Sequence, residues 1–159
     1  MARSKVSIAA SEQQLDALRE LLREYESLLR RHHTGPDFEK EIAGLPGEYA
    51  PPHGICLLVE EDDQIAGCVV LRRLEEGICE MRRLYVRPEF RGRGIGRMAT
   101  VALCREARRI GYRKVRLLSM RSMTEAIALY HSLGFREIAP YRSTTAKDPF
   151  YMEGDLSEF

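Results

Sequence analysis

The sequence predicts a three-layer α+β (α/β) domain, with about four helices around a mixed, mostly antiparallel sheet of about seven strands that includes a splayed parallel pair. Three observations predict it. Strand-like segments follow one another between residues 55 and 86, a strand–helix–strand order comes after them, and an amphipathic helical pattern precedes them. The chain has 159 residues, the length of one domain, so we expect a single unit over 1–159.

The first third of the chain predicts one short strand and two helices. Alternating residues favour a strand over 5–10. Ser11 is then the expected N-cap of a helix whose leucines recur at helical spacing and which ends near 32–35. A short second helix is expected over 37–43, and the proline- and glycine-rich stretch 45–54 predicts a loop.

The rest of the chain predicts an antiparallel meander that leads into a crossover. Strands are expected over 55–60, 65–74 and 78–86, with short turns between them. Because a strand–helix–strand crossover joins parallel strands, the strands at 78–86 and 114–119 are predicted to be parallel neighbours. The other expected elements are helices over 91–110 and 124–133 and strands over 135–139 and 150–156.

Composition and charge argue against several classes of protein. Basic residues gather between Arg82 and Arg121, but the formal net charge is only +1 and aromatic residues there are few, so we expect no nucleic-acid partner. No apolar run predicts a signal peptide or a membrane span, and the four cysteines form no C-x-x-C pair, so we expect a cytoplasmic protein with reduced thiols. The histidine and cysteine spacing matches no standard metal site. The oligomeric state is left open, with a homodimer as one option.

A glycine-rich loop stands between an expected strand and an expected helix. In the pattern Arg91-x-x-Gly94-x-Gly96, with a further glycine at Gly92, missing side chains let the backbone come close to a ligand. Helix-start N–H groups and the helix dipole favour an anion such as phosphate. The P-loop pattern is absent and the dinucleotide fingerprint is met only loosely, so both of those interpretations are weak. A plain turn is the alternative.

The strand before this loop departs from period two. The apolar residues Met81, Leu84 and Val86 are spaced by three and then by two, so an extra residue at 82–83 predicts a β-bulge. A bulge would splay this strand from its parallel partner and leave backbone groups open to an extended ligand. The alternative is a regular buried strand with a long arginine side chain that reaches solvent.

Together these residues resemble the GNAT superfamily of N-acetyltransferases. Two linked motifs carry the resemblance at the expected separation, and order and spacing match over roughly 65–139. The first motif begins at Glu80 and continues through Leu84-Tyr85-Val86 and Pro88 to Arg91-Gly92-Arg93-Gly94-Ile95-Gly96-Arg97. The second is Ala128-Leu129-Tyr130-His131-Ser132-Leu133-Gly134-Phe135.

The resemblance implies an acetyl-CoA cosubstrate. Its pyrophosphate is expected on the loop from Arg91 to Gly96, and its pantetheine arm against the backbone of the preceding strand, with a backbone N–H there holding the acetyl carbonyl. The cofactor-binding residues expected in this way are Leu84, Tyr85, Val86, Arg91, Gly92, Arg93, Gly94, Ile95, Gly96 and Arg97.

The resemblance also implies two catalytic residues. Tyr130 matches the tyrosine that lies near the CoA sulfur, where a phenol can protonate the leaving thiolate. Glu80 is the carboxylate best placed to take the amine proton, directly or through a water; a surface acid at the strand end is the equal alternative. The sequence departs from the family pattern at Met123, where many members carry a cofactor-contacting asparagine. Either Ser122 or Thr124 substitutes for it, or the contact is absent.

The leading functional hypothesis is direct acetyl transfer, in a ternary complex, to a primary amine of a small molecule, amino acid or peptide. The rival is a non-catalytic acyl-CoA-binding sensor or regulatory module. The loops 45–54 and 143–149 are expected to flank the acceptor site. Three arginines are candidates for binding a substrate carboxylate, and solvated surface charge is the alternative for them: Arg82, Arg83 and Arg142.

Overall fold

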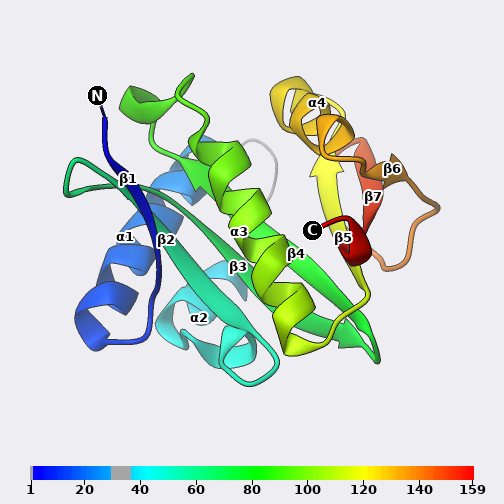
Figure 1. Ribbon diagram of the computed structural model, residues 1–159, viewed down its shortest axis with the longest axis horizontal. Coiled ribbons are helices and arrows are strands. Elements are labelled where there is room, and N and C mark those ends of the chain that lie inside the picture. Colours follow the sequence, from blue (N-terminus) through cyan, green and yellow to red (C-terminus); the bar gives the residue numbers. More distant parts are fainter. Residues whose placement is uncertain (1, 30–36) are drawn as a thin grey trace.

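The computed structural model describes residues 2–29 and 37–159 and contains, over these residues, one seven-stranded sheet with the order β1-β2-β3-β4-β5-β7-β6 (Figure 1). The predicted end of the first helix at 32–35 lies outside the described residues. The strands are β1 Ser4–Ile8, β2 Ile55–Glu61, β3 Gln64–Glu75, β4 Ile78–Val86, β5 Lys114–Met120, β6 Arg136–Glu137 and β7 Pro149–Asp155. The α-helices are α1 Glu12–Leu29, α2 Asp37–Ala43, α3 Ile95–Ile110 and α4 Thr124–Ser132.

The predicted fold class is confirmed. Strands β1 to β4 form the antiparallel meander, β4 and β5 are the parallel pair, and β7 runs antiparallel to both β5 and β6. The predicted strand over 135–139 is shorter than expected: β6 holds two residues, because Pro140 lacks an N–H to extend the ladder. No described helix combines the length and the apolar character that a membrane-spanning segment requires.

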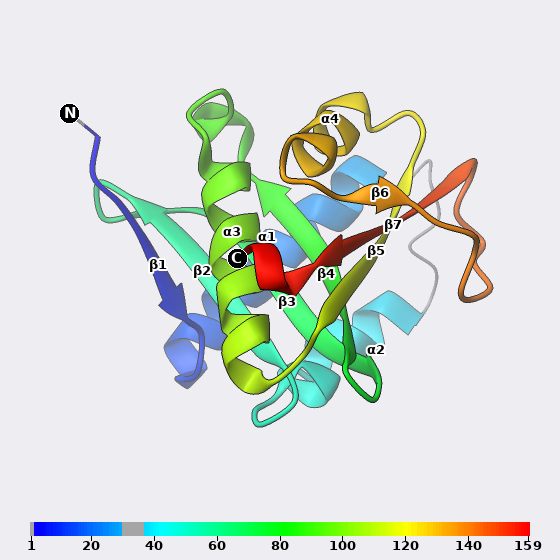
Figure 2. The same ribbon diagram turned by 45° about the vertical axis from the view of Figure 1, so that its right-hand side comes forward.

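The helices cover the sheet on both faces, as Figures 1 and 2 show. Side chains alternate along β2 between the two faces of the sheet, so neighbouring residues pack against different helices. Leu57 packs in the core beneath α3, whereas Leu58 packs in the core beneath α1 and α2. Helix α1 begins in a capping box, as the serine N-cap predicts. The Gln14 N–H donates to the Ser11 hydroxyl at 3.2 Å, and the Ser11 N–H donates back to the Gln14 side chain at 3.1 Å.

The predicted bulge is present in β4. The register with β3 shifts so that Arg82 is opposite Val70 but Tyr85 is opposite Cys68, which leaves two residues of β4 against one of β3. Arg83 takes a left-handed φ of 59° at this point. On the far side of the shift, Leu84 packs against the same core cluster that contains Met81, as the three-residue spacing predicts.

Beyond the bulge the parallel pair separates. Strand β5 pairs with β4 only over Ile78–Glu80, opposite Lys114–Arg116, and its remaining residues pair only with β7. Figures 1 and 2 show β4 and β5 starting together and diverging toward their C-terminal ends. The splay therefore opens next to the N-terminus of α3, and the described part of β4 has no strand partner on that side after Glu80.

Candidate functional site

Two cavities open along the splay, and both are lined by Tyr25 of α1 and Met123 at the start of α4. The first, which we call the cofactor cavity, has a volume of about 800 Å³. The second has a volume of about 510 Å³, and we call it the acceptor cavity because residues of the loop expected to flank the acceptor site line it. Because the two share these residues, a group bound at their junction would be reachable from both sides.

The cofactor cavity brings together almost all the predicted cofactor-binding residues. Its lining includes Leu84, Tyr85 and Val86 from the end of β4, and Arg91, Gly92, Gly94, Ile95, Gly96 and Arg97 from the loop and the start of α3. Arg93 does not line it. The Arg93 side chain turns toward the β2–β3 hairpin and donates to Glu61 at 2.7 Å. Arg93 can therefore offer a bound ligand its backbone but not this guanidinium.

The glycine loop has the geometry of an anion cradle. Gly92 and Gly94 have φ angles of 77° and 78°, which L side chains rarely adopt, so glycine is required for this turn. Gly94 is the N-cap residue of α3 and has no side-chain cap. The first intrahelical bond runs from the Met98 N–H to the Gly94 carbonyl at 3.0 Å. The N–H groups of 95–97 therefore have no partner within the helix and point out of its positive end.

Two arginines fix the rim of this cradle. Arg91 donates from Nε to the Val86 carbonyl at 3.0 Å, which ties the loop to the end of β4. Arg97 donates from Nη1 to the Ser132 hydroxyl at 3.0 Å, which ties α3 to α4. Both side chains line the cofactor cavity, so their charge adds to the attraction for a phosphate group.

The start of α4 completes the cofactor cavity. Ser122, Met123 and Thr124 all line it, so both hydroxyl residues that the sequence offers in place of an asparagine stand in the expected position. Met123 is the N-cap residue of α4 and makes no side-chain cap hydrogen bond.

Tyr130 lies in the hydrophobic core, behind the residues that line the two cavities. It is buried in the core beneath α3 and α4, with its ring centroid 5.7 Å from that of Phe135, and it lines neither cavity. Among the described residues its hydroxyl has no hydrogen-bond partner. Burial raises the pKa of Tyr130. The phenol therefore stays protonated at neutral pH and lies behind the cavity wall.

The acceptor cavity, on the opposite side of the shared wall, is lined by charged, polar and apolar residues. Strand β4 contributes Met81 to Arg83, β5 contributes Leu118 to Met120, and the loop before β7 contributes Arg142 to Ala146. This loop was expected to flank the acceptor site. The other expected loop, 45–54, takes part indirectly, through Glu48 and Tyr49.

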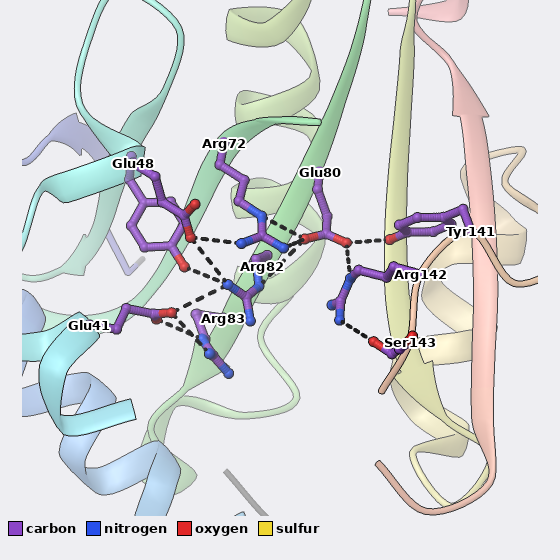
Figure 3. Close-up of polar contacts among 10 residues, drawn as sticks. Glu41, Glu48, Arg72, Glu80, Arg82, Arg83, Tyr141, Arg142 and Ser143 are labelled. Atoms are coloured by element: carbon purple, nitrogen blue, oxygen red, sulfur yellow. Dashed lines mark hydrogen bonds and ion pairs between the residues drawn. The ribbon is translucent and has the colours of Figure 1, made fainter. Parts of the chain in front are cut away.

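Glu80 lies at the centre of an ion-pair network beside this cavity, as Figure 3 shows. Its carboxylate is fully buried and faces Arg72 Nη2 at 2.7 Å and Arg142 Nε at 2.8 Å. The Tyr141 hydroxyl donates to the same oxygen as Arg142. These partners come from β3 and from the loop before β7, so Glu80 connects the two sides of the splay.

The network keeps Glu80 ionised. Burial by itself raises the pKa of this carboxyl, but hydrogen bonds from Tyr141 and Arg142 and the charge of Arg72 outweigh it, so the pKa is lowered overall. A carboxylate of low pKa is a weak proton acceptor. Glu80 as a general base thus stays a prediction, and its geometry also makes it an anchor for arginine side chains.

The bulge places two consecutive arginines on one face of β4. In a regular strand neighbouring side chains point to opposite faces, but Arg82 and Arg83 both reach Glu41 of α2, at 3.3 and 3.0 Å. Arg83 also lies over the Phe38 ring, 4.7 Å from its centroid. Burial raises the pKa of Glu41, yet the hydrogen bond and charge of Arg83 dominate and lower it overall.

Sequence reasoning missed Tyr25, Glu41 and Tyr141. Tyr25 follows the leucine spacing of α1 and was indistinguishable from core, although a polar aromatic residue in an apolar stripe is a signal that one end meets solvent or ligand. Glu41 and Tyr141 carry no local signal, because only tertiary contacts give them roles. His131 of the second motif is exposed on α4 and lines neither cavity.

Comparison with known proteins finds a family model and relatives that match most of the chain. The sequence model described as the acetyltransferase (GNAT) family matches residues 15–135. An uncharacterized N-acetyltransferase of Schizosaccharomyces pombe, C1271.07c, is 33% identical over 159 residues that cover 98% of each chain.

Solved structures share the fold at lower sequence identity. A GNAT-family acetyltransferase from Staphylococcus aureus superposes with a TM-score of 0.81 at 16% identity, over 97% of this chain and 99% of the other. A putative acetyltransferase from Salmonella typhimurium, yncA, whose structure contains acetyl-CoA as its cofactor, superposes with a TM-score of 0.75 at 21% identity, over 97% and 94% of the two chains.

Proposed function

The chain belongs to the GNAT family of acetyltransferases, and from this premise we propose that it transfers an acetyl group from acetyl-CoA to a primary amine by direct attack in a ternary complex. The observation that carries the proposal is the splay of β4 from β5 beside the glycine cradle, with a cavity on each side of Tyr25 and Met123. One cavity suits a long phosphorylated cosubstrate, and the other can admit the amine.

The proposed binding mode of acetyl-CoA follows from the cradle and the open strand edge. The pyrophosphate would accept hydrogen bonds from the free N–H groups of 95–97, with Arg91 and Arg97 adding charge. The loop glycines Gly92 and Gly94 and the backbone of Arg93 allow the close approach. The pantetheine arm would pair with Leu84, Tyr85 and Val86 as an added strand. That a structural neighbour binds acetyl-CoA supports this assignment.

The proposed reaction balances without a further co-reactant. The amine nitrogen bonds to the thioester carbonyl carbon, the C–S bond breaks, and CoA leaves as a thiolate. One proton leaves the amine and one reaches the sulfur, so no net proton is consumed. A backbone N–H near the bulge is proposed to stabilise the oxyanion. Tyr130, a phenol that is protonated at neutral pH, is proposed to donate to the sulfur, which requires its hydroxyl to come forward from its place behind the cavity wall.

The amine proton is proposed to leave through Glu80 by way of a water, because Arg82 and Arg142 lie between this carboxylate and the acceptor cavity. The lowered pKa of Glu80 limits how much of the proton it can hold. We therefore expect the dependence of the rate on pH to show no ionisation of Glu80 near neutral pH. Any rise of the rate with pH in that range should reflect deprotonation of the acceptor amine.

Calorimetric titration of the purified protein with acetyl-CoA and with CoA tests the first step. Saturable binding of both supports the cradle, and absence of binding overturns the proposal. The second step is release of CoA thiol in the presence of a panel of primary amines. Tight binding of acetyl-CoA without release for any amine would favour the non-catalytic sensor.

A further inference from the structure

Three guanidinium groups line the acceptor cavity. They belong to Arg82 and Arg83 at the bulge of β4 and to Arg142 in the loop before β7. Their side chains are 17%, 15% and 27% exposed, so each is mostly withdrawn from bulk solvent. Arginine groups that are partly desolvated and converge on one cavity are well suited to bind a carboxylate.

Each of these arginines is held through some of its nitrogens and keeps one terminal nitrogen without an acceptor among the described residues. Arg82 uses Nη1 for Glu41 and for the Tyr49 hydroxyl, and its Nε faces Glu80 at 3.6 Å. Arg83 uses Nε and Nη2 for Glu41. Arg142 uses Nε for Glu80 and Nη1 for the Ser143 carbonyl. Within the described residues, Nη2 of Arg82, Nη1 of Arg83 and Nη2 of Arg142 have no acceptor.

Neither Glu41 nor Glu80 lines the cavity, so the carboxylates lie behind the arginines and orient them. Side chains fixed in this way lose little further entropy when they bind a ligand.

The charge balance of the cluster favours one more anion. Arg72, Arg82, Arg83 and Arg142 supply four positive charges, and Glu41, Glu48 and Glu80 supply three negative ones, which leaves one positive charge. Asp37 also lines the cavity, but it is exposed in the first turn of α2 and is therefore solvated. None of the described ion pairs joins Asp37 to these arginines, so the cluster of paired side chains, in which Glu48 is about half exposed and Glu41 and Glu80 are buried more deeply, is balanced by a single carboxylate from outside.

We propose that the acceptor cavity binds the carboxylate of the acceptor, so that the acceptor is a free amino acid or another small amine that carries a carboxylate. This inference rests on the proposed acetyl transfer. Arg82 precedes Leu84 by two residues, at most about 7 Å along the strand, so a molecule of amino-acid size spans the arginines and the thioester position. The volume of about 510 Å³ fits a small ligand.

A panel of amino acids, each paired with its α-carboxamide, tests the proposal. The two members of a pair share the side chain and differ in the charge of the carboxyl group, which also raises the pKa of the α-amine in the acid, so kcat/KM is expressed per unprotonated amine. Thiol release gives kcat/KM for each, and the ratio of acid to amide is the readout. Because the ratio is taken within one preparation, it does not depend on how much of the protein is folded. We expect the best acid to exceed its amide by about 100-fold.

Arginine variants locate the effect. Arg142→Gln and Arg82→Gln are each expected to lower the acid-to-amide ratio at least tenfold. Arg73→Gln is the matched control, because Arg73 lies in β3 next to Arg72, is exposed and does not line the acceptor cavity. Its ratio is expected to equal that of the unaltered protein.

Amides that react as well as their acids, or a ratio that both cavity variants leave unchanged, overturn the carboxylate site while acetyl transfer stands. If no amine of either kind releases CoA, the proposed transfer fails instead. Calorimetric titration of the protein–CoA complex with the amino acids and their amides then tests the carboxylate site. Binding of the amino acids without binding of their amides supports the site. Equal binding of acids and amides, or binding of neither, overturns it.

Discussion

The two halves of the cleft are built by different means. The cofactor half is made mostly of main chain: two glycines at positive φ, the free N–H groups of α3 and the open edge of β4. The acceptor half is made of side chains, joined by ion pairs from α2, β3, β4 and the loop before β7. The two halves differ in sequence distance: the main-chain elements of the first lie within residues 84–97, whereas the second joins side chains up to 62 positions apart.

Because of this difference, the two halves of the cleft should be sensitive to different substitutions. A main-chain site is lost when the backbone is displaced or when a charge is introduced into it, whereas a side-chain network is lost when one member leaves its buried partners without a countercharge. Substitutions in the two halves should therefore separate stability from cofactor affinity.

The largest effect is expected from Glu80→Gln. The change leaves Arg72 and Arg142 facing a neutral amide in a fully buried position, which should lower the free energy of unfolding by about 3–5 kcal/mol. Urea denaturation measures it. Glu137→Gln is the control, because the Glu137–Arg121 pair is about half exposed and should matter by less than about 1 kcal/mol. Equal losses in the two variants would contradict the anchoring role.

The next effect is expected from Gly94→Asp. The new carboxylate would stand in the cradle at a φ of 78° and repel the pyrophosphate, so acetyl-CoA affinity should fall at least about 100-fold. Gly94→Ala is the control that introduces the backbone strain without the charge. Its Cβ would meet no heavy atom within 4 Å, so only the backbone strain of about 1–2 kcal/mol remains. Calorimetry with acetyl-CoA compares the two, and unchanged affinity in the aspartate variant would exclude the cradle.

A smaller effect is expected from Tyr130→Phe. We expect kcat to fall about 10-fold, below the usual range for a general acid because burial raises the pKa of this phenol. Affinity for acetyl-CoA should not change, and neither should the melting temperature, since no described residue pairs with the hydroxyl. Steady-state kinetics with calorimetry check this. Equal losses in turnover and in cofactor affinity would indicate a structural role instead.

The smallest effect is expected from a moderate fall in pH. The pKa values of Glu41 and Glu80 are lowered in the folded protein, so their contribution to stability is complete above the pKa of the unfolded chain, near 4.5, and is lost as pH falls through the folded values. The free energy of unfolding should thus change little between pH 7 and pH 5 and drop more steeply below about pH 4. A steep loss above pH 5 would be inconsistent with the ion-pair network.

Local patterns made the cofactor half predictable. The broken period at Met81, Leu84 and Val86 predicts the bulge, the crossover rule predicts the parallel pair, and glycine at positions 92 and 94 predicts a backbone that only glycine adopts readily. Each pattern depends on neighbours in the sequence, because steric limits on φ and the alternation of side chains act over a few residues.

The sequence by itself therefore determined the layers, the splay and the place of the cradle. Only the tertiary structure decided that Arg82 and Arg83 share one face, that Glu41 and Glu80 stand behind the arginines, and that Tyr130 is withdrawn from the cavity wall. The physical reason is that ion pairs and burial depend on distances through space. Residues 41, 80 and 142 come within hydrogen-bonding range of their partners only after the sheet has formed.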